Sequence, residues 1–287
     1  MSDPSPARFV LGTHVYPASG AAGGRVNAAL AGWRALGVEL VNLQFADGVP
    51  LEYDGFRTVR GLTRDSNTVT GRAGTRKPVM QEVFDLLCRE ARAAGARYFG
   101  FSNADIIVSD AAIARVYAAG GDAHVFSRGE SDPAAAPPGG IFVSGQDTFV
   151  VAVSFWERHR HRFRDYVIGE MPWDVIYTSI LLSHGKAHLH NTEPLTRHVS
   201  HDVIWADSPF SDYRWYLARL DWTYFQRWYA YYNPVLARRE TQGRIDAEWE
   251  RDQLRLVFGA PISTVRRGFQ GAKNLYYRAR YRAAGRV

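Results

Sequence analysis

Short apolar runs alternate with helical patterns through the first half of the chain, and this alternation limits the possible folds more than any other feature. The apolar runs lie at 8–17, 38–45 and 96–108, and the helical patterns lie at 26–36, 78–94 and 110–119. Strands joined in this way by helices are typical of a mainly parallel sheet with helices on its faces. The sequence therefore predicts an α/β fold, in which ligands bind at the carboxyl ends of the strands.

The second half continues with strands and then changes character. Strand-like runs at 123–127 and 141–153 are separated by a Pro- and Gly-rich linker, and a helical pattern follows at 173–183. After these elements the chain becomes helical, basic and rich in aromatic residues. We therefore expect an α/β domain over 1–207 and a helical C-terminal extension over 208–287.

Two stretches are predicted to be loops. Residues 20–24 contain three glycines after the first apolar run, but they match neither the dinucleotide-binding fingerprint nor the P-loop. Residues 46–78 are polar and lack a sustained periodicity. We expect a turn at the first stretch and a long loop at the second.

The composition is that of an ordered globular protein, with 46% hydrophobic and 22% charged residues. The single cysteine, Cys88, has no partner for an internal disulfide, which favours a reducing compartment. No secretion signal is visible, and the longest apolar stretches are too short to cross a bilayer of roughly 30 Å. We expect a cytoplasmic protein and leave open a peripheral contact with the inner face of the membrane.

The charge balance favours anionic partners. The formal net charge is +6 and the pI is near 9.5, with dense basic groups at 158–164 and 266–286. No motif of the standard nucleic-acid-binding modules is visible, so nucleic acid is not an expected partner. Phosphate groups on a small molecule or a lipid fit this charge.

The apolar run 96–108 is interrupted near its middle by Asn103 and Asp105. Positions two apart share one face of a strand, so both side chains would be able to hold one ion or phosphate. A carboxylate in such surroundings is costly unless it is paired, hydrogen-bonded or bound to a metal. The interruption marks a candidate site, and the simpler alternative is a pair of residues that caps the turn into the next helix.

Four blocks of the sequence, taken in order, resemble a known family. They are Tyr-Phe-Gly-Phe-Ser-Asn-Ala-Asp-Ile-Ile-Val at 98–108, Gly-Gln-Asp-Thr-Phe-Val-Val at 145–151, Val-Ile-Gly-Glu-Met-Pro-Trp-Asp at 167–174 and Thr-Arg-His-Val-Ser-His at 196–201. Together they resemble the GT-A-fold nucleotide-diphospho-sugar transferases, over roughly residues 8 to 205. The resemblance implies a GT-A-like domain that binds a nucleotide-sugar donor and transfers its sugar.

In that superfamily, a strand ends in an Asp-x-Asp motif whose carboxylate holds Mn²⁺ or Mg²⁺ on the donor diphosphate. Asn103 and Asp105 occupy the corresponding place, so the resemblance implies that Asp105 binds the metal and that Asn103 accepts a hydrogen bond. A later histidine completes the site in the family, and His198 and His201 fit this role equally. Because an amide replaces the first carboxylate, the site carries less negative charge and should bind metal more weakly.

The acceptor hydroxyl must lose its proton as it attacks, if transfer inverts the sugar. Asp174 and Asp147 are the candidate bases, with Glu170 behind them, and Trp173 would stack on a sugar ring. Asp174 also fits a structural role at a helix start, and Asp147 fits a polar bend in a strand.

Basic residues precede the run at 96–108. Arg72, Arg76 and Lys77 are candidates for contact with the donor diphosphate, and a solvated basic loop is the favoured alternative.

Five histidines lie within eighteen residues: His184, His188, His190, His198 and His201. On a strand, His188 and His190 would share one face, which is an arrangement that metal sites use. The rival enzyme is therefore a metal-dependent hydrolase or phosphotransferase that uses His188, His190, His198 and His201.

Aromatic and arginine residues interleave from Tyr213 to Arg239. Such a stretch rests on a membrane interface or packs as a helix against the main domain, and packing is the favoured interpretation.

The sequence thus predicts a hexosyltransferase-like glycosyltransferase. Its donor is a nucleotide-diphospho-sugar, and its acceptor is a hydroxyl on a glycan or a lipid-linked molecule, as in polysaccharide or cell-surface glycan synthesis. The non-enzyme alternative is a nucleotide-sugar-binding or scaffold protein that keeps the fold without turnover.

Overall fold

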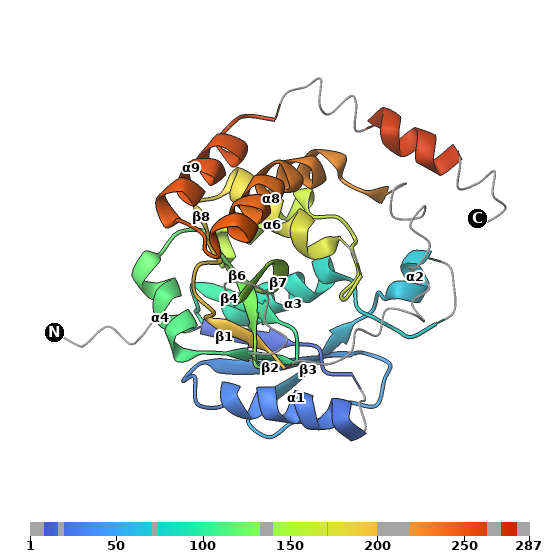
Figure 1. The fold of residues 1–287 in the computed structure, drawn as a ribbon. Helices are drawn as coiled ribbons and strands as arrows, with labels where there is room; N and C mark the ends of the chain where they lie inside the picture. Colours follow the sequence, from blue (N-terminus) through green and yellow to red (C-terminus); the bar gives the residue numbers. More distant parts are fainter. Residues whose placement is uncertain are drawn as a thin grey trace.

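A computed structural model of the chain describes residues 9–16, 20–70, 74–132, 140–170, 172–199, 219–262 and 271–279. One nine-stranded sheet forms its centre (Figure 1). The strands are β1 Phe9–Thr13, β2 Glu39–Phe45, β3 Arg57–Leu62, β4 Tyr98–Ser102, β5 Ile106–Val108, β6 Ala123–Glu130, β7 Ile141–Ala152, β8 Ala187–His190 and β9 Thr196–His198.

The strand order is β3-β2-β1-β4-β7-β6-β9-β5, with β8 also paired to β6. Strand β1 runs parallel to β2 and β4, and β7 is antiparallel to both β4 and β6. The carboxyl ends of β1, β2, β4 and β6 therefore meet at one edge of the sheet. The fold is α/β with a mixed, mainly parallel sheet of GT-A-like arrangement, as the sequence predicts.

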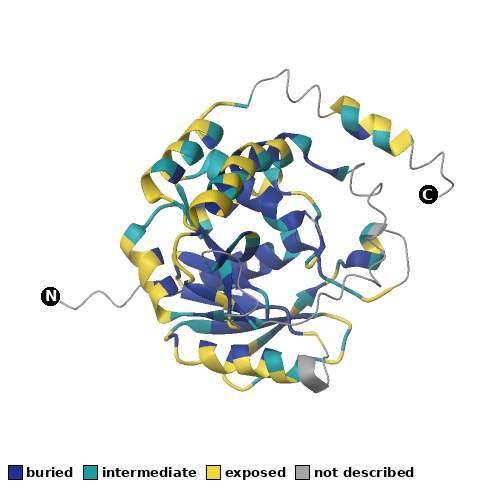
Figure 2. Ribbon diagram, viewed as in Figure 1, coloured by how far each residue is buried: buried dark blue, intermediate teal, exposed yellow. Residues whose placement is uncertain are grey.

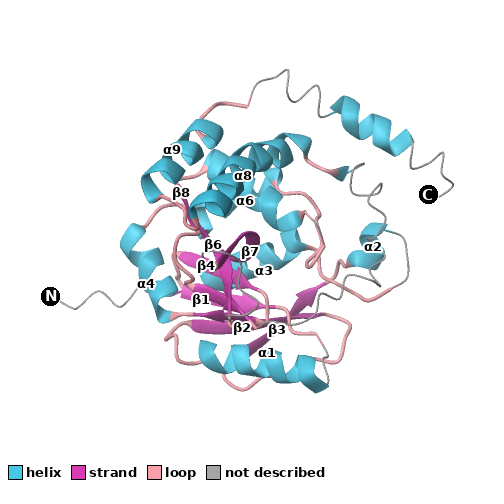
Figure 3. Cartoon of the chain, viewed as in Figure 1, coloured by secondary structure: helices cyan, strands magenta, loops and turns pink. Residues whose placement is uncertain are grey.

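Helices cover both faces of the sheet (Figures 1 and 3). Helix α1 lies on one face, and α3, α6 and α8 lie on the other. The helices are α1 Gly20–Trp33, α2 Ser66–Thr70, α3 Met80–Ala93, α4 Asp110–Ala119, α5 Val153–His159, α6 Trp173–His184, α8 Trp222–Gln242 and α9 Ala247–Phe258, with a short 3-10 turn η2 Arg160–Arg162 and a further helix at 271–279.

The core lies between the sheet and α3, where buried residues concentrate (Figure 2). Phe84 of α3 is fully buried, and its ring lies 5.7 Å from that of Phe99 and 5.1 Å from that of Trp156. Helix α3 forms because apolar residues recur at helical spacing along its inner side, and burying each large one contributes about 2 kcal/mol. This packing fixes β4 and thereby the position of the residues at its end.

Both loop predictions are wrong in part. Residues 20–24 lie in the first turns of α1 and not in a loop. The stretch 46–78 contains β3, which extends the sheet beside β2, and the short helix α2. Periodicity misses β3 because its burial alternates irregularly among polar residues at the edge of the sheet.

The run 96–108 is two strands and not one. Strand β4 ends at Ser102, a turn contains Asn103 and Asp105, and β5 then pairs with β9. The two polar residues therefore do not share the face of one strand, which corrects the premise of the sequence argument. Turn residues direct side chains independently of strand alternation.

The aromatic residues after 219 pack inward. Tyr224, Trp228 and Tyr231 of α8 are buried and belong to the same apolar core as the sheet. The packing interpretation is confirmed for these three residues. The expected boundary at 207/208 lies outside the described residues, and none of the helices within them is long and apolar enough to cross a membrane.

Candidate functional site

The end of β4 is tied to β7 through Asn103 and Asp147. The Asn103 backbone N–H donates to the Asp147 carbonyl at 3.1 Å, and Asn103 Nδ2 donates to Asp147 Oδ1 at 2.7 Å. The other carboxylate oxygen of Asp147 accepts from Arg128 Nη1 at 2.7 Å. Two donors, Asn103 and Arg128, therefore hold the buried Asp147 carboxylate in place.

Arg128, on β6, lies among three carboxylates. Its Nε atom lies 3.6 Å from Glu130 Oε1, in addition to the bond with Asp147. Burial lowers the pKa of Arg128, but the charges of Asp147, Glu130 and Asp105 outweigh burial and raise it. Gly145 makes room for this side chain, since a Cβ there would lie 3.1 Å from Arg128 Cγ.

Asp105, His198 and Glu130 form a second line of contacts. Strand β9 places His198 opposite Ile106 of β5 and opposite Glu130 of β6. His198 Nδ1 lies 3.1 Å from Glu130 Oε2, and its Nε2 lies 3.4 Å from Asp105 Oδ2. A carboxylate only accepts hydrogen bonds, so the proton of this contact is on Nδ1 and Glu130 fixes the tautomer.

This donor set fits the divalent cation that the resemblance implies. When the His198 ring is neutral and its proton is on Nδ1, its Nε2 atom has a lone pair and accepts. Nε2 and the Asp105 carboxylate are then two acceptors side by side, and such a pair requires a proton or a cation between the two atoms. Histidines that bind metals commonly donate their other N–H to a carboxylate, as His198 does to Glu130. Mg²⁺ needs only one or two protein ligands when substrate phosphates supply the rest.

Asp105 and His198 are accordingly the residues that would hold the metal. Across the described ranges, no group of three His, Cys, Asp or Glu side chains is placed to hold one ion. His201, the alternative ligand from the sequence, lies outside the described residues.

Asp174 lies in the first turn of α6, near Asp147. Burial and the negative charge of Asp147 raise the pKa of Asp174 to about 7, although the backbone N–H groups of Asp174 and Val175 oppose this shift. A carboxyl group with this pKa exchanges its proton near neutral pH, as a general base requires. The structural role at a helix start and the role of a base are therefore compatible at this residue.

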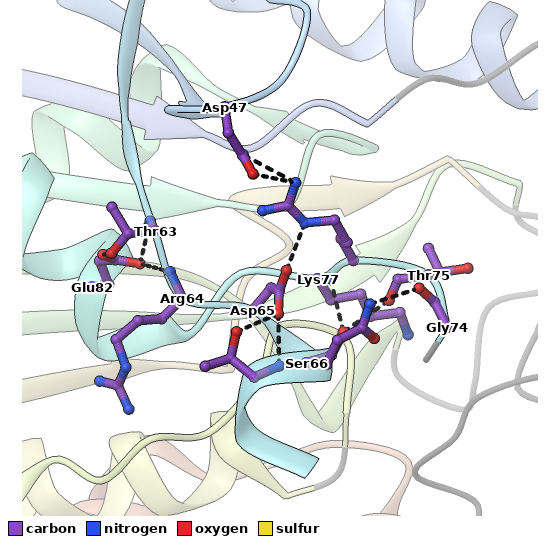
Figure 4. Close-up of polar contacts among 12 residues, drawn as sticks. Asp47, Thr63, Arg64, Asp65, Ser66, Gly74, Thr75, Lys77 and Glu82 are labelled. Carbon is purple, nitrogen blue, oxygen red and sulfur yellow. Dashed lines mark hydrogen bonds and ion pairs between the residues drawn. The ribbon is translucent and has the colours of Figure 1, made fainter. Parts of the chain in front are cut away.

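Arg76 and Lys77 lie in the loop between α2 and α3, which Figure 4 shows. Arg76 donates to Asp65 at 2.6 Å and to Asp47 at 3.0 Å, and Lys77 Nζ donates to Glu170 at 2.8 Å. Arg76 and Lys77 thus each have a carboxylate partner. Lys77 fixes Glu170 in the segment that leads into α6 and Asp174, which gives both residues a positioning role.

Two aromatic residues border this region. Trp173 is 3% exposed and packs against Phe149, with ring centroids 5.0 Å apart, so it offers no stacking face to a sugar. Tyr16, just beyond β1, is 52% exposed. Burial of its hydroxyl raises the pKa of Tyr16, and the charge of Asp105 raises it further, which places the end of β1 near Asp105.

Within the described residues, the histidines of the cluster do not form one site. His188 and His190 share a face of β8, as predicted, and stack on His124 of β6 at ring distances of 5.0 and 5.4 Å. Strand β8 pairs His188 with His124, whereas β9 pairs His198 with Glu130. His124 and Glu130 are six residues apart along β6, which corresponds to about 20 Å.

Sequence reasoning missed Arg128 and Glu130. The predicted strand ended at residue 127, whereas β6 extends to Glu130. A polar Arg-Gly-Glu stretch at the end of a strand-like run is the same signal that marked Asn103 and Asp105, and applied at 128–130 it would have found both. Arg72 lies outside the described residues.

Comparisons with known proteins add similarity of fold only. No protein-family model matches the chain, and no curated protein matches it in sequence. Among solved structures, 4-diphosphocytidyl-2C-methyl-D-erythritol synthase from Anaerococcus prevotii is similar at 12% identity and a TM-score of 0.40, covering 68% of this chain and 94% of that one. A glycosyltransferase involved in glycosylation of the major capsid of PBCV-1 matches at 8% identity and a TM-score of 0.36, with the same coverage.

A third structure, assigned as a UDP-N-acetylglucosamine pyrophosphorylase from Entamoeba histolytica, matches at 9% identity and a TM-score of 0.40. It covers 77% of this chain and 83% of that one. Similarity at this level carries no argument about the chemistry of the site, which depends on the residues described above.

Proposed function

We propose that the protein is a glycosyltransferase that moves a sugar from a nucleotide-diphosphate donor to a hydroxyl of a glycan or lipid-linked acceptor. One observation carries this proposal: the metal-type pair of Asp105 and His198 lies at the same sheet edge as Asp174, a carboxyl group with a pKa near 7. A donor site and a base are the two parts that direct sugar transfer requires.

The donor side is built around Asp105. A divalent cation held by Asp105 and His198 would neutralise the charge that develops on the leaving diphosphate. Glu130 keeps the His198 ring oriented toward Asp105 through the bond to Nδ1. Arg128 adds a fixed positive charge beside these carboxylates, which limits the repulsion between them and an incoming diphosphate.

The acceptor side is built around Asp174. The ionised Asp174 carboxylate takes the proton of the acceptor hydroxyl. At the same time the hydroxyl oxygen attacks the anomeric carbon, and the bond from that carbon to the diphosphate breaks. The negative charge of Asp147 raises the pKa of Asp174 and so makes it a stronger base, while Asn103 and Arg128 hold the Asp147 carboxylate in place through their hydrogen bonds. In this account Asp147 and Glu170 act as positioning residues and Asp174 is the catalytic base.

The histidine-based hydrolase has less support. His188 and His190 lie beside the start of β6 and His198 lies beside its end, about 20 Å away, so these three described histidines do not hold one metal ion. The non-catalytic alternative shares the donor site and differs only in turnover.

A thermal-shift screen tests the proposal. UDP-, GDP- and dTDP-sugars with Mn²⁺ are expected to raise the melting temperature by mass action, and a CMP-sugar, which lacks a diphosphate, is expected to raise it less. Asp105→Ala should abolish the shift. Asp54→Ala, which removes an 88% exposed carboxylate near α1, should retain it.

The result that contradicts the proposal is the absence of a shift with every nucleotide sugar, or a full shift in Asp105→Ala. Intact donor binding without any release of nucleoside diphosphate, across glycan and lipid-linked acceptors, would instead favour the non-catalytic protein.

A further inference from the structure

The helix at 271–279 has two different sides. Its inner side packs on the start of α8: Tyr277 stacks on Trp222 with ring centroids 5.5 Å apart, and Lys273 Nζ lies 4.4 Å from the centre of the same indole ring. Asn274 is buried in this contact. These residues orient the helix on the protein.

The outer side carries large apolar side chains. Leu275 is 71% exposed and Tyr276 is 56% exposed, and Figure 2 shows the exposed residues along this helix. Only four other large hydrophobic residues in the described ranges are comparably exposed: Tyr16, Val49, Tyr117 and Leu256. Two adjacent exposed apolar residues on one short helix are therefore unusual for this molecule.

Positive charge gathers around the same helix. Burial lowers the pKa of Arg219, and the nearby charges of Arg278 and Arg164 lower it further, although Asp165 opposes this effect. Arg278 of the helix and Arg164 each lie near Arg219. Asp221, 3.6 Å from Arg164, and Asp165 only partly balance these charges.

The sequence near the C-terminus also has more basic than acidic residues. From residue 253 to the end, the chain has no Asp or Glu and has eight basic residues: Arg255, Arg266, Arg267, Lys273, Arg278, Arg280, Arg282 and Arg286. Basic residues next to exposed Leu and Tyr on a helix are typical of segments that lie in the interface of an anionic bilayer.

We propose that the helix at 271–279, with its exposed Leu275 and Tyr276 and its own Arg278, binds the surface of an anionic lipid membrane. The apolar pair enters the boundary between head groups and acyl chains, and Arg278 contacts the lipid phosphates. Nucleic acid also attracts basic surfaces, but it offers no apolar layer for an exposed leucine, which favours the membrane. The proposal is independent of sugar transfer.

Vesicle co-sedimentation of the full chain tests it. The protein is expected to sediment with vesicles that contain phosphatidylglycerol, to bind pure phosphatidylcholine vesicles much less, and to detach at high salt. Leu275→Ser with Tyr276→Ser should lower the partition coefficient at least about tenfold, because the apolar contact is lost. Arg278→Glu should lower it by a factor of about ten, because the reversal replaces attraction by repulsion.

Matched variants give the controls. Val49→Ser is the control for the apolar pair, because Val49 is the most exposed large apolar side chain of the described residues and lies in a loop away from the helix at 271–279. Arg89→Glu is the control for Arg278→Glu, because it makes the same charge change on α3, where the Arg89 side chain is 62% exposed. Both should bind vesicles like the wild type.

Three results would overturn the proposal: no binding of wild type to anionic vesicles, equal losses in the control variants, or retention of RNA with no retention of vesicles. The thermal-shift screen reports separately on the donor site, so failure of one proposal is distinguishable from failure of the other.

Discussion

Strand β6 carries polar residues at both ends, and the two ends differ in their partners. Near its start, His124 is fully buried and stacks with His188 and His190. Near its finish, Arg128 and Glu130 contact Asp147 and His198. Both ends contain or contact histidine, but only the second brings histidine together with carboxylates.

The difference lies in the charge state that each end favours. Burial, followed by the charge of a neighbouring histidine, lowers the pKa of His124 to about 4 and that of His190 to about 3. At the other end, Asp105 and Glu130 contact His198, and the charges of Asp147, Glu130 and Asp105 raise the pKa of Arg128 against the effect of burial. The comparison teaches that a high density of histidines in a sequence does not by itself mark a candidate site, and that the partners of each histidine must be known as well.

The largest expected effect comes from removing the proposed base, Asp174, near the end of β6 that carries Arg128 and Glu130. Asp174→Asn should lower the turnover number about 10²- to 10⁴-fold and leave donor affinity nearly unchanged, because an amide cannot take a proton. Wild-type activity should rise with pH through about 7, as Asp174 loses its proton. Steady-state kinetics over a pH series measures both.

His188→Gln is the control at the opposite end of β6, and its turnover should stay within about threefold of the wild type. Equal losses in the two variants would remove the distinction between the two ends.

The next effect concerns the partner of His198. Glu130→Gln should weaken Mn²⁺-dependent donor binding about 10- to 100-fold, because the ring of His198 loses the carboxylate that orients it and fixes its tautomer. Calorimetric titration measures this affinity. Glu193→Gln, which removes a 55% exposed carboxylate paired with Arg115, should bind donor normally. Unchanged affinity in Glu130→Gln would show that His198 needs no such partner.

A smaller effect tests the neutral end of β6. The folded-state pKa of His124 lies below its unfolded value of about 6.5, so the unfolded state binds more protons between these values. The free energy of unfolding should therefore fall as the pH drops from about 6.5 to about 4. His124→Phe should remove on the order of 2 kcal/mol of this fall, as measured by denaturant titration at both pH values. The same pH dependence in both proteins would contradict the assignment of a neutral, buried His124.

The smallest effect is on the stability of the Asp174 variant. The folded-state pKa of this carboxyl is raised, so its ionisation costs stability as pH rises from about 4 to about 7. Asp174→Asn should therefore be more stable than the wild type at pH above about 7, by about 1 kcal/mol because the group is partly exposed. The difference should vanish near pH 4, and a less stable variant at high pH would argue against a strained Asp174.

The sequence predicts much of the fold because local patterns determine it. The runs predicted as strands at 38–45 and 123–127 fall on β2 and on the first part of β6, and the helices predicted at 78–94, 110–119 and 173–183 fall on α3, α4 and α6, because periodicity along the chain marks them. Strand β3 escapes this approach because its pairing with β2, and not its own pattern, makes it a strand.

The site is predictable only in part. Polar breaks in apolar runs point to Asn103, Asp105 and Asp147, but their partners depend on sheet order. Glu130 meets His198 because β9 adds to β6, 68 positions along the chain, and no local pattern encodes that contact. The separation of His188 from His198 has the same origin, since β8 and β9 pair with different halves of β6.

The central claim is that the carboxylate end of β6 holds the donor and its metal. Anomalous scattering from a crystal grown with Mn²⁺ and a nucleoside diphosphate tests it most directly, because it locates the ion without reference to activity. The account predicts a peak between Asp105 and His198, about 2.2 Å from their ligand atoms and in contact with the diphosphate. A peak at His124, His188 and His190, or a diphosphate bound elsewhere on the protein, would contradict it.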